Sequence, residues 1–176
     1  PERLGSVLEA IYLIFNEGYA ASAGDDWMRP ALCEEALRLA RILAHRMPAP
    51  PVLGLLALME LQASRAAARV DAQGMPVLLD QQNRARWDWL QIARGQQALA
   101  QAVAAGGQHD TYVLQAQIAA CHAAARQAAQ TDWARIAALY AQLLQVMPSP
   151  VVALNRVVAV SRSDGAFAAW ALLQPL

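Results

Sequence analysis

The chain has 176 residues, 57% of them hydrophobic, and its 14 basic and 14 acidic side chains give a formal net charge of zero. That length supports one domain with a substantial core, and high apolar content at zero net charge excludes a disordered chain. Neutrality also argues against direct nucleic-acid binding by this segment, because a surface that grips phosphates usually carries a basic excess.

The residue types favour helices. The chain holds 40 alanines and 24 leucines against 12 valines and 6 isoleucines, so helix formers far outnumber β-branched residues. No apolar run reaches the roughly 18 residues that indicate a membrane span, and no signal peptide is visible. Cys33 and Cys121 are far apart and indicate reduced thiols. We therefore expect an all-α cytoplasmic protein without a membrane partner.

Helical spacing and breakers divide the N-terminal part into three helices. Apolar residues recur every three or four positions from Leu4 to Phe15, and Gly18 with the stretch Ala23–Asp26 ends that pattern. Prolines then begin the second helix and separate it from the third. In the third helix Gly54 and Ala57 allow close approach of a neighbour. The predicted helices are Leu4 to about Gly18, Pro30–Met47 and Val52–Ala68.

Residues 70–83 interrupt the helices. Asp71–Gly74 has turn chemistry, and Met75–Leu79 is too short and too proline-marked for a helix, so we expect an ordered irregular loop with a short extended segment. Beyond it Gly106-Gly107, the cap residues Thr131 and Asp132, Pro150 and Asp164-Gly165 mark further boundaries. The remaining predicted helices are Arg84–Ala105, Thr111–Ala125, Trp133–Met147, Pro150–Ser161 and Ala166–Leu173.

Two segments 100 positions apart look alike. A helix, a proline turn and a second helix occur in each, and the matching residues are Leu39, Leu43, Met47, Pro48, Pro50 and Val52 against Leu139, Leu143, Met147, Pro148, Pro150 and Val152. The offset is about three times the period of a tetratricopeptide helix pair, although the strict consensus is absent. We predict a single helical-repeat domain over residues 1–176, with about eight helices in antiparallel pairs stacked as a tetratricopeptide-like solenoid.

No pattern for catalysis or metal binding stands out. Cys121 and His122 are neighbours and point about 100° apart on a helix, so they cannot both face one ion well, and no zinc-binding spacing occurs. Neither a nucleophile elbow nor a glycine-rich phosphate loop is present. We expect no catalytic residues, no metal and no cofactor.

The densest polar cluster surrounds the loop. Arg65 and Arg69 share one helix face before it, and Arg84 follows it, so these side chains can converge. One interpretation is that they satisfy the backbone of an irregular loop, and the other is a ligand or partner groove. Trp87 and Trp89 point apart, so we expect one of them to be exposed. The candidate groove residues are Glu17, Arg65, Arg69, Asp71, Gln82, Arg84, Trp87, Asn155 and Arg156.

A series of motifs follows in order along nearly the whole chain. The segments are Tyr12–Tyr19, Leu32–Arg41, Gly54–Met59, Ala67–Asp71, Gln82–Arg84, Trp87–Asp88, Leu114–Ala120, Thr131–Trp133 and Pro148–Arg156. Together they resemble the C-terminal, tetratricopeptide-like extension of extracytoplasmic-function (ECF) RNA polymerase sigma factors. One departure is Asn83, at a position where that family favours aspartate.

The resemblance implies a transcription initiation factor whose promoter-binding domains lie outside these residues. The first residue is Pro1, which fits an excised piece of a longer polypeptide. On this hypothesis the partners are core RNA polymerase or the parent protein's N-terminal sigma domains, and promoter DNA is contacted only through the absent domains. The alternative hypothesis is a module that senses a small molecule or peptide in the groove near residues 65–88.

Overall fold

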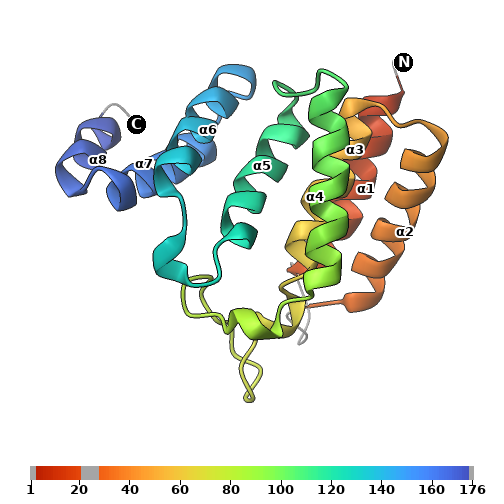
Figure 1. Ribbon diagram of the computed structural model, residues 1–176, viewed down its shortest axis with the longest axis horizontal. Coiled ribbons are helices and arrows are strands. Elements are labelled where there is room, and N and C mark those ends of the chain that lie inside the picture. Colours follow the sequence, from red (N-terminus) through yellow and green to blue (C-terminus); the bar gives the residue numbers. More distant parts are fainter. Residues whose placement is uncertain (1–2, 21–27, 175–176) are drawn as a thin grey trace.

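The computed structural model describes residues 3–20 and 28–174, and these form α-helices, short 3-10 helices and connecting loops (Figure 1). The expected all-α fold is confirmed. Within the described ranges there are eight α-helices: α1 (Leu4–Tyr19), α2 (Pro30–Arg46), α3 (Pro50–Ala63), α4 (Trp89–Ala104), α5 (Thr111–Ala124), α6 (Trp133–Val146), α7 (Pro150–Ser163) and α8 (Ala166–Leu173).

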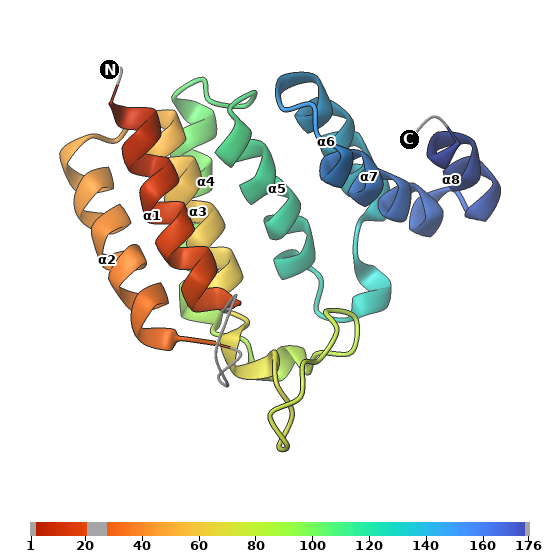
Figure 2. The same ribbon diagram turned by 180° about the vertical axis from the view of Figure 1, so that it is seen from behind.

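Consecutive helices pack as pairs, and the pairs stack on one another. α1 packs against α2, α3 against α4, α5 against α6, and α7 against α8, while α3 also packs against α5 and α6 against α7. Figure 2 shows α1, α3, α5 and α7 following one another along one side of the molecule. This arrangement is the helical-repeat stack that the sequence predicts.

The repeat 100 residues apart is a repeat of backbone conformation. Met47 and Met147 end α2 and α6 with nearly the same dihedral angles, φ −143° and ψ 82° against φ −137° and ψ 77°. Their amides donate to the carbonyls of Leu43 and Leu143, and a proline begins the next helix in both copies. The proline turn therefore sets how one pair meets the next at both places.

Aspartate side chains begin three of the helices in the second half. Asp88, Asp110 and Asp132 each accept a hydrogen bond from a backbone amide in the first turn of α4, α5 and α6. Such caps satisfy amides that have no partner within the helix. Of the two predicted cap candidates, Thr131 and Asp132, the structure has Asp132 as the cap. At the other end of α4, Gly106 takes a φ of 85°, which a glycine adopts without strain.

Two predicted helix boundaries were wrong. α3 ends at Ala63 instead of Ala68 because the Ser64 carbonyl accepts the Asp88 amide at 2.8 Å, and the chain continues as a 3-10 helix at Ala66–Ala68. α4 begins at Trp89 instead of Arg84 because Asn83 caps a separate 3-10 helix, Arg84–Arg86, before the Asp88 cap. Both changes lengthen the irregular segment.

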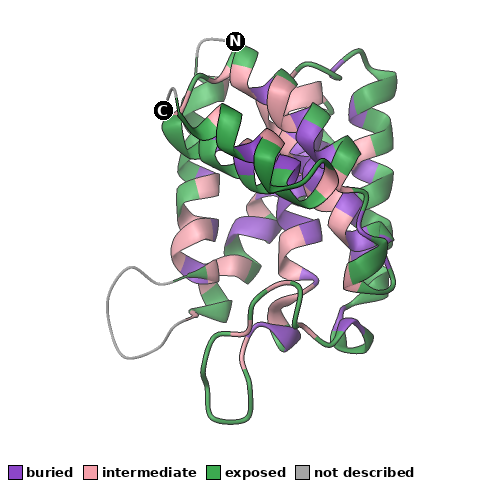
Figure 3. Ribbon diagram, turned by 90° about the vertical axis from the view of Figure 1, so that its left-hand side faces the viewer, coloured by how far each residue is buried: buried purple, intermediate pink, exposed green. Residues whose placement is uncertain are grey.

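The predicted irregular loop lies at one end of the stack. An isolated antiparallel bridge joins Val70 to Pro76, which is the short extended segment that the sequence predicts. Residues 71–76 are exposed and form the lower green loop of Figure 3. The predicted helix-ending stretch Ala23–Asp26 lies outside the described residues. None of the described helices is both long and apolar enough to cross a membrane.

Candidate functional site

The arginines before the loop reach back to the end of α1. Arg65 donates to the Tyr19 hydroxyl at 3.2 Å, while Arg69 donates to the Tyr19 carbonyl and places its guanidinium 3.5 Å from the centre of the Tyr19 ring. Arg69 is buried, and this desolvation is the main cause that lowers its pKa from the ordinary arginine value. Arg69 therefore attaches α1 to the loop and does not line a groove floor.

Arg84 is also buried, and it connects the end of α5 to the start of α6. Its Nη1 donates to the carbonyls of His122 and Ala125, both at 2.6 Å, and its Nη2 lies 3.5 Å from the Thr131 hydroxyl. The last carbonyls of a helix have no partner within it, and an arginine side chain is well suited to supply donors. This contact favours the interpretation that Arg84 satisfies backbone groups.

Four other predicted groove residues hold local structure. Asp71 accepts the amides of Gln73 and Met75 and so closes the loop turn, and Gln82 donates to the Val77 carbonyl. Glu17 forms an ion pair with Arg29 at 3.0 Å. Trp87 is 3% exposed and Trp89 is 37% exposed, which confirms the expectation that one of the two is exposed. Trp87 packs in the core and is not available to a partner.

A groove does form between α3, α5 and α7, and three predicted residues, Arg65, Arg84 and Asn155, line it. Arg65, just beyond the end of α3, and Asn155 of α7 line one cavity of about 360 Å³. A second cavity of about 190 Å³ adjoins it and shares Leu79 and His122 with it. We call the joined cavities the arginine groove. Its lining includes Gln62, Arg65, Leu79, Gln115, Ile118, Arg84, His122, Thr131, Trp133, Tyr140, Val151, Asn155, Val158 and Arg162.

The arginine groove exists because α7 packs mainly on α6 and α8. The space that α7 leaves beside α3 is floored by one face of α5. Gln115 and His122 are seven apart on α5, so their side chains point the same way, into this space. The structure places Asn155 of α7 in the same cavity as Arg65. Arg156, which the sequence grouped with Asn155, lines neither cavity, because the next position on a helix points about 100° away.

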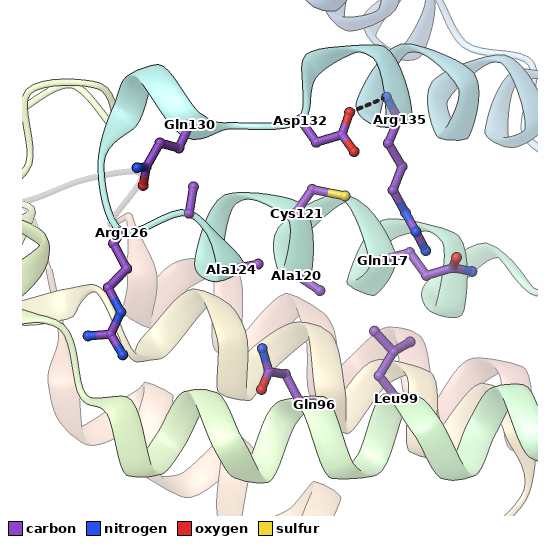
Figure 4. Close-up of a pocket in the computed structure, with 11 residues that line it drawn as sticks. Gln96, Leu99, Gln117, Ala120, Cys121, Ala124, Arg126, Gln130, Asp132 and Arg135 are labelled. Carbon is purple, nitrogen blue, oxygen red and sulfur yellow. Dashed lines mark hydrogen bonds between the residues drawn. The ribbon is translucent and has the colours of Figure 1, made fainter.

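The opposite face of α5 floors a second groove, which sequence reasoning missed. It lies between α4 and α6 and has a volume of about 430 Å³ (Figure 4). Its floor consists of the small side chains Ala120, Cys121 and Ala124, and three glutamines line its sides. We call it the glutamine groove. Its polar lining residues are Gln96, Gln117, Arg126, Gln130, Asp132 and Arg135.

The neighbouring Cys121 and His122 open on different grooves. Cys121 lies in the glutamine groove and His122 in the arginine groove, as their separation of about 100° on the helix predicts. Among the described residues, no group of three or more His, Cys, Asp or Glu side chains is arranged to hold a metal ion. Burial raises the pKa of Cys33 to about 11 and that of Cys121 above its ordinary value. Neither thiol is therefore ionised at neutral pH.

A buried carboxylate was also missed. Glu60 is 2% exposed in the middle of α3, and its Oε1 lies 2.8 Å from Arg41 of α2 and 3.8 Å from Arg94 of α4. An acid inside the apolar stretch Val52–Leu61 is a signal for a paired buried charge. Glu60 joins three helices and lines neither cavity of the arginine groove.

The free energy of unfolding should depend on pH through His122, which lines the arginine groove. Burial, followed by the charges of Arg65 and Arg84, lowers its pKa from 6.5 to about 4. The unfolded chain therefore binds this proton more readily than the folded protein between pH 6.5 and about 4. The stabilising contribution of neutral His122 is complete above pH 6.5 and decreases as pH falls, by at most about 1.4 kcal/mol per pH unit.

Urea unfolding of the chain and of His122→Gln over this pH range measures that contribution. We expect the stability difference between them to shrink as pH falls towards about 4. The exposed histidine variant His109→Gln is the control and should keep the dependence of the parent chain. An identical pH dependence in His122→Gln would show that His122 titrates normally.

Comparison with known proteins gives a family but no activity. The model of a family of unknown function, DUF6596, matches residues 3–103. An uncharacterised protein of Rhizobium meliloti (strain 1021) is 47% identical over 176 residues, covering 99% of this chain. The chain spans about two fifths, 41%, of that relative's length. No solved structure gives a significant match.

Proposed function

This chain belongs to the DUF6596 family, a family of unknown function, and we propose that it is the regulatory, protein-interaction domain of a longer ECF-type sigma factor. In this role it contacts the parent protein's promoter-binding domains or core RNA polymerase. Its influence on transcription is exerted through protein contacts. Promoter DNA is bound by the other domains of the same polypeptide.

The arginine groove is the observation that supports this proposal most. Inner helices of a stacked repeat present side chains at regular spacing along an extended surface, which is how such proteins bind other proteins. Here α3, α5 and α7 each contribute side chains to one groove. The motif series in the sequence adds the sigma-factor class, and the neutral charge of the chain agrees with a role away from DNA. The length of the Rhizobium relative leaves room for further domains.

Deleting this domain from the longer protein tests the proposal. We expect promoter-dependent transcription with core RNA polymerase to change by about tenfold or more, which corresponds to a coupling free energy of about 1.4 kcal/mol. The measurement is run-off transcription with the intact and the deleted protein at equal concentration. A matched control is the intact protein with the exposed substitution Arg86→Ala. Unchanged transcription after the deletion would rule out a regulatory role.

The glutamine groove favours a second function, the sensing of a small polar ligand. Its volume of about 430 Å³ lies within the usual range for ligand sites, and its amides and arginines offer donors and acceptors above an apolar floor. Arg69 and Arg84, which the sequence suggested as ligand contacts, are instead committed to backbone carbonyls. A ligand screen by thermal shift should therefore compare the chain with Gln96→Ala and Gln117→Ala.

A further inference from the structure

One side of α7 carries apolar side chains that the described part of the chain leaves about half exposed or more. Val151, Leu154 and Val158 are 67%, 50% and 48% exposed, and they recur at positions i, i+3 and i+7 of one helix. That spacing normally marks a face that packs against a neighbour. Val151 and Val158 also line the arginine groove. The α7 wall of the groove therefore offers two accessible apolar side chains on either side of the polar Asn155.

The charge of the groove is positive. Among the described residues neither Arg65 nor Arg84 forms an ion pair, since their partners are hydroxyl groups and backbone carbonyls. The other two charged lining residues, Asp80 and Arg162, form an ion pair with each other at 3.3 Å, so their charges offset each other. His122 is neutral at pH 7 because its pKa is lowered to about 4.

Arg65 is the accessible member of this positive pair. Its side chain is half-buried just beyond the end of α3 and lines the larger cavity, whereas Arg84 is 6% exposed. Arg84 nevertheless adds positive potential, because a buried charge is poorly screened by solvent. A carboxylate placed at Arg65 would complete an ion pair that the described residues do not supply.

We propose that the arginine groove binds an acidic amphipathic segment of a partner protein, with its apolar side chains over Val151 and Val158 and a carboxylate on Arg65. This inference rests on the proposed function, because it names the chemistry of the surface that a regulatory domain would recognise. Nucleic acid is a poorer fit, since the other accessible arginine of the groove, Arg162, is already paired with Asp80 and the chain carries no net charge.

A pair of peptides tests the proposal directly on the 176-residue chain. The probe is a short fluorescent peptide with leucines at helical spacing and glutamates between them, and its partner has lysine at each glutamate. In fluorescence anisotropy at low salt we expect the acidic peptide to bind about tenfold more tightly or better. Equal binding of the two peptides, binding of neither, or tighter binding of a single-stranded oligonucleotide would overturn the proposal.

Matched substitutions locate the binding. Arg65→Glu should weaken binding of the acidic peptide about tenfold or more. Arg126→Glu makes the same change of net charge in the glutamine groove and should not weaken it. Val158→Asp should also weaken binding, while Val146→Asp, at a position of the same 48% exposure on α6, should not. Equal losses in a variant and its control would contradict a specific site.

Arg65→Glu removes the hydrogen bond to the Tyr19 hydroxyl, so thermal unfolding of each variant checks that it is folded. Val158 is exposed, so Val158→Asp tests the groove even if Arg65→Glu is destabilised. The peptide experiment and the deletion experiment test the groove chemistry and the regulatory role separately. If transcription depends on the domain but the acidic peptide does not bind, the groove chemistry is wrong and the regulatory role stands. If the peptide binds and the deletion leaves transcription unchanged, the regulatory role is wrong.

Discussion

Replacing Arg84 with alanine is expected to lower the free energy of unfolding by about 3–5 kcal/mol, because each hydrogen bond from a charged group contributes about 1.5–3 kcal/mol. Arg84 makes two short ones, to the His122 and Ala125 carbonyls. Without the guanidinium these carbonyls at the end of α5 stay buried without a donor. Urea unfolding followed by far-UV circular dichroism at pH 7 measures the loss.

Arg86→Ala is the control for this prediction. Arg86 belongs to the same 3-10 helix but is exposed, so its removal should change stability by no more than about 0.5 kcal/mol. Arg84→Lys keeps the charge but lacks the forked guanidinium, and we expect a loss between those of alanine and the parent chain. If Arg84→Ala were as stable as Arg86→Ala, the structural interpretation of Arg84 would be wrong, and its role in a ligand site would have to be reconsidered.

Arg84 illustrates why the sequence predicted the helices better than the site. Helix boundaries depend on neighbours in sequence, so Pro30, Asp132 and Gly165 marked theirs correctly. Arg84 instead meets carbonyls 38 and 41 residues away, and such partners leave no local pattern. The sequence predicted a cluster of polar residues near the loop. It could not predict which of them donate to backbone carbonyls and which line a groove.

The two grooves depend on how the helix pairs pack against one another. Such packing is harder to predict from the sequence than the contacts of a single side chain. α5 carries apolar or small residues on several sides, so its pattern predicted a helix without indicating which elements flank it. Asn155 shares a cavity with Arg65 because α7 follows α3 and α5 along the same side of the stack. The glutamine groove was not predicted, since Gln96 of α4 and Gln130, just before α6, line one groove only when both segments are placed beside α5.

Gly54→Val is expected to destabilise the chain by about 3 kcal/mol by forcing α3 away from α5. A Cβ at Gly54 would lie 2.6 Å from Val113 Cγ2 and 2.8 Å from the Val113 backbone nitrogen. That nitrogen cannot retreat easily, because its amide donates to the Asp110 cap at 3.3 Å. Overpacking of this kind typically costs about 1–3 kcal/mol and occasionally more, well above the few tenths that valine gains over glycine in helix propensity.

Gly5→Val is the matched control, because Gly5 lies in α1 and a Cβ added there would meet no heavy atom within 4 Å. The same substitution at this position should be neutral or slightly stabilising, and thermal and urea unfolding of both variants measure the difference. Since α3 is a wall and α5 the floor of the arginine groove, Gly54→Val should also weaken binding of the acidic peptide while Gly5→Val leaves it unchanged. Equal stability of the two variants would show that α3 and α5 can separate without cost, and the groove would then not be a rigid site.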